Sequence, residues 1–363
     1  MILTTILFIL ILGLFVFVHE LGHFLAAKSC GIKVLEFAFG FPPRIWSKKR
    51  GETEYSINAI PIGGYVKMLG EADESKNPRS FSQKSPLIRG FVSVAGVIMN
   101  LLLAWLILAI GFAVGISPIV SSPDSIPGKI VSSSVIATEI ENDSPAKKAG
   151  ISAGDELISG QSVGEAIVSF SSSATLVNFT KTHAGKDVGI SYNRGGKISN
   201  ATVYLSANSA APLGVGVIEN SVVQVPWYLT PIVAFREVVK IVEVNLSFIG
   251  KFFVQLFSSG SVSKDVGGPV AIYVYTGLAA KAGVMVFLQF VAILSIGLAI
   301  INIIPFPALD GGRLLFIILE KIFRRKVLTE RVENIFHNVG FALILLFAAV
   351  VTYRDVVNFI IKK

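Results

Sequence analysis

The sequence is poor in cysteine, histidine and charged residues. Its one cysteine, Cys30, excludes an intramolecular disulfide and a cysteine-rich structural zinc site. Any histidine-based site must draw on His19, His23, His183 or His337. Only 15% of the residues are charged and 52% are hydrophobic, whereas about 25% of residues are charged in a soluble domain. This composition predicts a membrane protein.

Four segments almost free of charge are long enough to cross about 30 Å of hydrocarbon. They are residues 1–27, 90–117, 282–309 and 334–353. The first has no basic residue before its apolar run and no small-residue cleavage site ahead of His19. We therefore expect it to be retained as a membrane span rather than removed as a signal peptide.

Lysine and arginine gather between the first and second segments, residues 28–89, and between the third and fourth, residues 313–331. Because short loops rich in basic residues stay in the cytoplasm, both termini and the long middle region are expected outside it. The net charge of +8 follows from this topology. No sequence motif for nucleic-acid binding accompanies it, and no nucleic-acid partner is expected.

The end of the first apolar segment contains an H-E-x-x-H pattern, His19 to His23. Residues four apart lie on one face of a helix, so both imidazoles can reach one metal ion while Glu20 lies beside it. Ionisable groups at membrane depth are costly and are usually functional or paired. The pattern predicts zinc-activated water with Glu20 as the base.

A catalytic zinc site needs a third protein ligand. His183 falls in the exported region, on the wrong side of the membrane, and His337 begins the fourth span, where it would commonly face the interface. Asp310 is the better candidate. Two prolines and two glycines surround it in the stretch N-I-I-P-F-P-A-L-D-G-G, which should break the third span where the carboxylate emerges.

These motifs resemble those of the site-2 protease family of intramembrane zinc metalloproteases, peptidase family M50, particularly the bacterial regulators of envelope-stress sigma factors. Residues 19–23 match the first family motif, and residues 302–311 match N-x-x-P-x-P-x-L-D-G. The resemblance implies that Asp310 is the third zinc ligand and that Asn302 holds the substrate or an oxyanion. Residues 96–100 resemble the G-x-x-x-N motif of the second span, which implies that Asn100 supports the site; Val97 stands where many relatives have proline.

Residues 53–70 contain extended apolar stretches interrupted by Pro61, Gly63 and Gly64, which is typical of a hairpin. An ordinary cytoplasmic hairpin fits this composition equally well. The resemblance implies instead the membrane-re-entrant β-hairpin of the family, beside the active site. There Gly63 and Gly64 could offer backbone groups to an unwound substrate by strand addition.

Residues 118–225 are rich in Ser, Gly and Asn, with short alternating strands, as in a soluble α+β domain. Residues 141–158 resemble the S-P-A-x-x-A-G-L-x-x-G-D-x-I signature of PDZ domains in this family. Residues 226–257 are apolar but contain five charges, which predicts a helix on the outer membrane surface. The following G-G-P-V, residues 267–270, resembles the segment before the third span in relatives, with a structural or a substrate-guiding role.

The predicted fold is an α-helical polytopic membrane protein of four spans, with a re-entrant hairpin and one inserted PDZ domain. The regions are residues 1–117, 118–225, 226–281 and 282–363. The resemblance implies a zinc endopeptidase of a bacterial inner membrane, with its active site toward the cytoplasm. It would cleave transmembrane segments of single-span proteins, such as anti-sigma factors, or remnant signal peptides. A non-catalytic PDZ scaffold or chaperone is the alternative, and a metal transporter is a weaker one.

Overall fold

The computed structural model describes residues 2–71, 75–207, 209–259, 267–325 and 330–357. It divides into two compact units, the first formed by Met1–Ala109 with Ala234–Lys363 and the second by Ile110–Val233. The chain ends predicted to lie outside the cytoplasm, Met1 and residues 358–363, are beyond the described residues.

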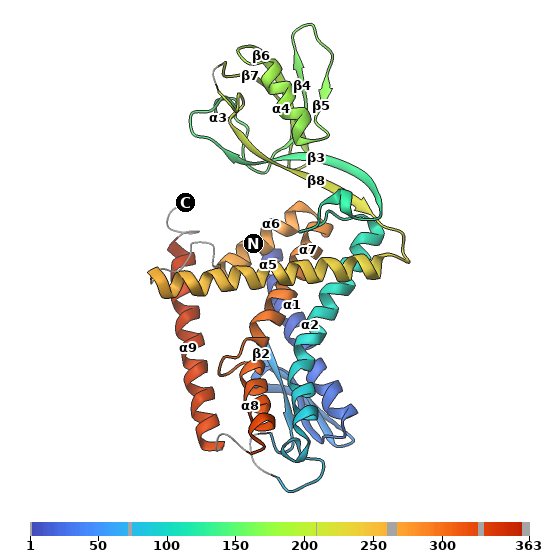
Figure 1. The fold of residues 1–363 in the computed structure, drawn as a ribbon, viewed down its shortest axis with the longest axis vertical. Coiled ribbons are helices and arrows are strands. Elements are labelled where there is room, and N and C mark those ends of the chain that lie inside the picture. Colours follow the sequence, from blue (N-terminus) through green and yellow to red (C-terminus); the bar gives the residue numbers. More distant parts are fainter. Residues whose placement is uncertain (1, 72–74, 208, 260–266, 326–329, 358–363) are drawn as a thin grey trace. The chain divides into compact units, whose positions relative to one another are not determined.

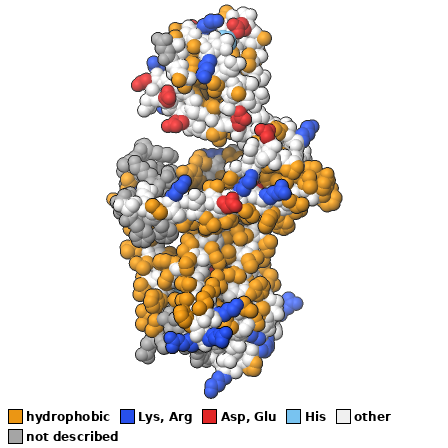
Figure 2. All heavy atoms as spheres, in the orientation of Figure 1, with side chains coloured by type: hydrophobic (Ala, Val, Ile, Leu, Met, Phe, Trp, Pro, Cys, Tyr) orange, Lys and Arg blue, Asp and Glu red, His pale blue; other side chains and the backbone are white. Residues whose placement is uncertain are grey.

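Four of the described helices are long and apolar enough to cross a membrane, by length and composition: α1 (Ile2–Ser29), α2 (Pro86–Val114), α7 (Val284–Ile303) and the part of α9 (Glu330–Val356) from Ile335 to Val356. Each overlaps one of the predicted segments. Many of their large apolar side chains are exposed, which suits contact with lipid. Figure 2 shows hydrophobic side chains over the helices of the first unit and basic side chains gathered at one end of it.

The third apolar segment is interrupted, as predicted. Pro305 and Pro307 lack backbone N–H donors, so α7 ends at Ile303 and residues 304–309 are not helical. Ala308 has a left-handed backbone with φ of 77°. A new helix, α8 (Asp310–Phe323), begins at the aspartate, so Arg313, in the connection between the third and fourth spans, lies in a helix.

A β-sheet of β1 (Val34–Arg50) and β2 (Thr53–Met68) lies after α1 (Figure 1). Phe37 pairs both with Tyr55, in the first half of β2, and with Val66, in its second half. The two halves of β2 thus lie on opposite sides of the start of β1. The hairpin predicted for residues 53–70 is therefore part of a larger sheet whose partner strand begins at Val34.

Ion pairs join the turn of this sheet to the end of α1. Glu52 accepts hydrogen bonds from Lys28 at 2.9 Å and from both terminal nitrogens of Arg79 at 2.7 and 2.6 Å. These bonds, from Arg79 first and then Lys28, lower the pKa of Glu52 to about 2. The carboxylate therefore stays charged at neutral pH and holds the turn beside α1.

Two apolar clusters of the first unit lie along α1. One joins Ile11 and Phe15 to Val291 of α7, and the other joins Ala26 and Ala27 to the β-sheet, to α2 and to Ile317 of α8. In the sequence of α1, His19 and His23 fall between these clusters. Packing on either side therefore determines where the two imidazoles point.

The G-G-P-V segment begins a helix. Pro269 is the first residue of α6 (Pro269–Ala282), and the buried carboxylate of Asp355 in α9 accepts hydrogen bonds from the N–H groups of Gly268 at 2.9 Å and Ala271 at 3.0 Å. A carboxylate is favourable at a helix N-terminus, where donors are unpaired. A Cβ at Gly268 would lie 2.7 Å from Val351, which explains the glycine. The contacts give this segment a structural role.

The segment before it is the long helix α5 (Thr230–Ser259), which runs crosswise to α9 (Figure 1). Exposed apolar side chains lie along α5, including Phe235 and Val244, together with the five charged residues noted in the sequence. Residues 260–266, within the predicted surface region, lie outside the described residues.

The second unit contains an antiparallel sheet in the order β7-β6-β4-β3-β8, with β5 paired to β4. The strands are β3 (Lys129–Ile140), β4 (Glu156–Ser162), β5 (Val168–Ser169), β6 (Asp187–Arg194), β7 (Lys197–Tyr204) and β8 (Val215–Gln224). Helices α3 (Pro145–Lys148) and α4 (Ser173–Thr182) accompany the sheet, and Leu157, Phe179 and Ile190 are in its core. Short 3-10 helices lie at Phe81–Gln83 in the first unit and Pro123–Ser125 in the second.

An ion pair between the buried Asp155 and the exposed Arg194 stabilises this second unit. Asp155 is 1% exposed. Arg194 donates to its two oxygens at 2.7 and 2.6 Å, and the N–H of Ser152 donates at 2.8 Å. Burial opposes ionisation, but these hydrogen bonds hold the pKa of Asp155 below its ordinary value.

Replacing Arg194 by glutamine should lower the stability of the second unit by about 1–3 kcal/mol at pH 7, because it leaves a buried carboxylate short of donors. A lowered folded-state pKa stabilises the fold above the unfolded pKa of about 3.9 and loses that contribution as the pH falls through the folded value. The loss caused by R194Q should therefore shrink below about pH 4. Hydrogen exchange of β4 and β6 in the whole protein, corrected for intrinsic rates, measures it. Lys197→Gln, at an exposed position, is the control. An equal loss of stability at pH 7 and below about pH 4 would refute the role assigned to the pair of Asp155 and Arg194.

Candidate metal centre

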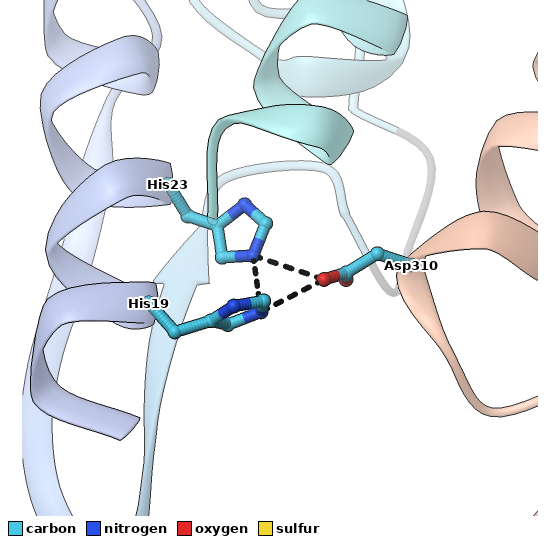
Figure 3. Close-up of side chains that lie close together, drawn as sticks. All are labelled: His19, His23 and Asp310. Atoms are coloured by element: carbon cyan, nitrogen blue, oxygen red, sulfur yellow. Dashed lines mark hydrogen bonds and ion pairs between the residues drawn. The ribbon is translucent and has the colours of Figure 1, made fainter. Parts of the chain in front are cut away.

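Three donor groups from two helices meet within the first unit (Figure 3). His19 and His23 come from α1 and Asp310 from the start of α8, and their ligand atoms all lie within 4.8 Å of one another. The Nε2 atoms of the two histidines are 3.2 Å apart, and Oδ2 of Asp310 lies 2.8 Å from that of His19 and 3.3 Å from that of His23. The histidines are 8% and 9% exposed.

The spacing of these donors fits one small cation. Nitrogen and oxygen ligands about 2.0–2.1 Å from a tetrahedral zinc ion lie about 3.3 Å from each other. The three distances of 3.2, 2.8 and 3.3 Å are close to this value. Two neutral imidazoles and one carboxylate are also a donor set that leaves a fourth position open for water or substrate.

Glu20 follows His19 on α1 but is not a member of the three-donor group. It is half-buried, and a Cβ built on Gly64 of β2 would lie 3.3 Å from its Cγ. The side chain of Glu20 thus lies between α1 and the β-sheet. A carboxylate in this place is adjacent to the donors, as a general base must be.

The two glycines predicted to face the substrate allow close approaches. A Cβ at Gly64 would lie 2.9 Å from the carbonyl oxygen of Ala38, and Gly63 has φ of 106° and packs on the ring of Phe41. Gly64 therefore brings the second half of β2 against α1 beside Glu20. Glycine is needed here because a side chain would push the strand away from the helix.

One face of α2 contacts both histidines. Nδ1 of His23 donates to the carbonyl of Val92 at 2.8 Å, and Nδ1 of His19 lies 3.2 Å from the amide of Asn100. Between them, a Cβ at Gly96 would lie 2.6 Å from Cε1 of His19 and 2.6 Å from Nε2 of His23. The glycine of the G-x-x-x-N motif therefore leaves room for the imidazoles.

Replacing Gly96 by alanine should weaken zinc binding by about tenfold or more, because the added methyl group displaces both imidazoles and supporting contacts of metal ligands have effects of this size. Titration of the purified apoprotein against a competing chelator measures the change. Gly297→Ala is the matched control, since the described residues leave open space around that glycine of α7. Wild-type affinity in Gly96→Ala would refute the close packing.

The remaining candidates lie elsewhere. Asn302 is half-buried in the last turn of α7, and its role stays a prediction. His337 is exposed on α9 and is not part of the described donor group. His183 belongs to the second unit, where it bonds to Glu165 at 2.7 Å and to the carbonyl of Phe179 at 2.8 Å.

Sequence reasoning missed one contact near the site. Arg313, one turn after Asp310, donates to Glu71 at 2.5 Å, and the same carboxylate accepts the N–H of Met68 at the end of β2. This pair ties the helix that begins at Asp310 to the sheet that lies against Glu20. In the sequence Arg313 counts only as one of the basic residues between the third and fourth spans, and only its closeness to Asp310 could have suggested this contact.

Comparison with known proteins identifies the family of this chain. The sequence profile of Peptidase family M50 matches residues 7–347. The chain belongs to peptidase family M50. The membership confirms the predicted family and the predicted activity class, a metalloprotease, and with the long apolar helices it makes the chain an integral membrane protein.

Individual relatives match the M50 chain along almost its whole length. A protein of Clostridium perfringens is 36% identical and the match covers 94% of this chain and 95% of the relative. One of Clostridium acetobutylicum is 34% identical, with 96% of both chains covered. Both have names that provisionally class them as zinc metalloproteases, in agreement with the predicted cofactor.

A solved PDZ domain, that of an SdrC-like protein from Listeria monocytogenes, is 24% identical and covers 25% of this chain and 93% of its own, with a TM-score of 0.21. This TM-score is too low to assign a fold.

Proposed function

We propose that this M50 peptidase is a zinc-dependent intramembrane endopeptidase that cleaves transmembrane segments of single-span membrane proteins. The observation that supports this most directly is the position of its donor group. His19 and His23 lie on a helix long and apolar enough to cross a membrane, and Asp310 completes the group from a second helix. A peptidase centre placed there meets peptide bonds that lie within the bilayer. Anti-sigma factors in regulated proteolysis and remnant signal peptides are the substrate classes that the family implies.

His19, His23 and Asp310 would hold the zinc ion. When bound, the ion supplies Lewis acidity, which polarises the scissile carbonyl and makes water easier to deprotonate. Glu20 accepts the proton of the attacking water and later donates it to the leaving amine. Its half-buried position beside β2 keeps it close to the donors without using it as a ligand.

The second half of β2 would present the substrate to this centre. Helical segments hide their amide groups in their own hydrogen bonds, so a substrate must unwind before it is cleaved. An unwound segment can add as a strand to an exposed sheet edge. The approach of Gly64 to Glu20 places backbone groups of β2 beside the base. Asn302, at the end of α7, would hold the substrate or the developing oxyanion.

For the topology, we propose four spans in a bacterial inner membrane, with the active site toward the cytoplasm and both termini outside it. The basic residues of 28–89 and 313–331 support this orientation. Helix α5 would lie on the outer membrane surface, with apolar residues such as Phe235 in the headgroup region.

The second unit would be a PDZ domain. The signature in residues 141–158 supports this, as does β8, which pairs with β3 at the end of the sheet order and contacts the start of α4 through Glu219 and Ser173. An added peptide strand could pair with β8. The domain would select substrates, by holding an extended peptide or by excluding bulky exported domains.

Quantitative proteomics of membrane-protein fragments tests the proposed function. Cells producing the active enzyme are compared with cells producing Glu20→Gln, at equal protein level. We expect a few single-span proteins to accumulate uncut in the variant, with termini in the active cells that map inside their transmembrane segments. Cleavage confined to soluble segments would contradict intramembrane proteolysis.

A further inference from the structure

The two metal-facing histidines are supported from the same helix in matching ways. Nδ1 of His23 lies 2.8 Å from the carbonyl oxygen of Val92. A carbonyl can only accept, so this Nδ1 carries the proton and Nε2 keeps a lone pair for a metal ion. Val92, Gly96 and Asn100 are four residues apart and share one face of α2. Asn100 therefore contacts Nδ1 of His19 in the same way that Val92 contacts Nδ1 of His23.

The group that faces His19 is an amide, which can either donate or accept. Nδ2 of Asn100 lies 3.2 Å from Nδ1 of His19. A donating amide would place the imidazole proton on Nε2, and that nitrogen could then bind no metal. The two ends of an amide have the same shape, so their assignment follows from the hydrogen bonds they must make. Metal binding by His19 requires the carbonyl end.

The surroundings of Asn100 leave its carbonyl end free for this role. Asn100 is 0% exposed, and its Oδ1 has no hydrogen-bond partner among the described residues. Its backbone is fixed separately, because Oγ of Ser295 in α7 donates to the carbonyl oxygen of Asn100 at 2.8 Å. A completely buried side chain against a ligand is poorly placed to touch a substrate but well placed to orient the ligand.

We propose that Asn100 is a positioning residue that accepts the Nδ1 proton of His19 through Oδ1 and thereby keeps Nε2 of His19 free and directed at the metal. This rests on the proposed function, since it assumes that the donor group binds zinc. Under this proposal Asn100 orients a metal ligand and does not contact the substrate or the transition state.

Two variants of the whole protein show whether residue 100 must accept a hydrogen bond from His19 or donate one to it. Asn100→Asp keeps acceptor oxygens and has no amide donor, while Asn100→Leu keeps the approximate size and has neither. In chelator-competition titrations in detergent, N100L should bind zinc about 10- to 100-fold more weakly, and N100D should stay within about threefold of the wild type. Leu102→Ala, at an exposed position of the same helix, is the control.

A direct measurement needs no substitution at the site. The chain has four histidines, so ¹⁵N-histidine labelling gives few signals, and variants of His183 and His337 assign two of them. The zinc-loaded wild type should show protonated Nδ1 atoms in both His19 and His23. An unprotonated Nδ1 in His19 of the zinc-loaded protein, with N100D binding zinc as weakly as N100L, would overturn the inference.

The kinetic outcome also discriminates between roles. N100L saturated with zinc should recover cleavage with an unchanged KM, because Asn100 does not contact the substrate. Normal zinc affinity in N100L with a raised KM would instead make Asn100 a substrate-binding residue. A wild-type protein that takes up no zinc would overturn the proposed function itself, whereas wild-type zinc uptake that is equal in N100L would overturn only the role of Asn100.

Discussion

Glu20→Gln should lower the rate of peptide cleavage by about 10²- to 10⁴-fold, because a general base contributes a factor of this size. The same variant should keep about one zinc ion per chain, since the three ligand side chains remain. Cleavage of a transmembrane peptide in detergent and metal analysis of the purified variant measure the two effects. Glutamine has nearly the size of glutamate, so packing against Gly64 is preserved and the comparison isolates the proton transfer.

Two results would contradict this assignment of Glu20. Loss of zinc together with activity would place its carboxylate among the ligands, and retained cleavage would remove it from the chemistry. Glu71→Gln gives a useful comparison, because Glu71 bonds to Arg313 and to the N–H of Met68 and is not part of the donor group. Loss of the Glu71 carboxylate should loosen the sheet of β1 and β2 next to the donor group and leave Glu20 in place.

Asp310→Ala should empty the metal site and abolish cleavage. The carboxylate oxygen lies 2.8 and 3.3 Å from the two Nε2 atoms, and without it only two protein ligands remain. Removal of one ligand of three is expected to cost more affinity than loss of a supporting hydrogen bond, which costs about 10- to 100-fold. Metal content and cleavage rate of the purified variants measure the effect.

His337→Ala is the matched control for this experiment. His337 was the alternative third ligand, it is exposed on α9, and the described residues do not join it to the donor group. We expect H337A to retain zinc and activity. If H337A lost the metal and Asp310→Ala kept it, the third ligand would be assigned to the wrong helix.

Features that depend on residues close together in the sequence could be predicted. Four residues of helix bring His19 and His23 onto one face whatever surrounds them, and two prolines end α7 because they lack N–H groups. The membrane character follows from the long runs without charge. Family membership could also be predicted, because the motifs of residues 19–23 and 302–311 are specific in combination.

Features that depend on packing were not predictable. Asp310 is 291 residues from His19 in the sequence, and no local rule sets the distance between their ligand atoms at 2.8 Å. The same holds for the pairing of β1 with both halves of β2, for the cap that Asp355 provides to α6, and for the bond between Arg313 and Glu71. Each requires elements far apart in the chain to pack together before the side chains meet.

The sequence by itself determined which chemical groups this protein has available, two histidines and a carboxylate on one apolar helix, because helical spacing is a local property. Asp310 was the candidate that the motif offered, but only the tertiary structure brings its carboxylate to the histidines and decides what holds them in place. The close approach of α2 at Gly96, with a backbone carbonyl on His23 and an amide on His19, results from helix packing. Such contacts depend on distances between segments that no pattern within one segment specifies.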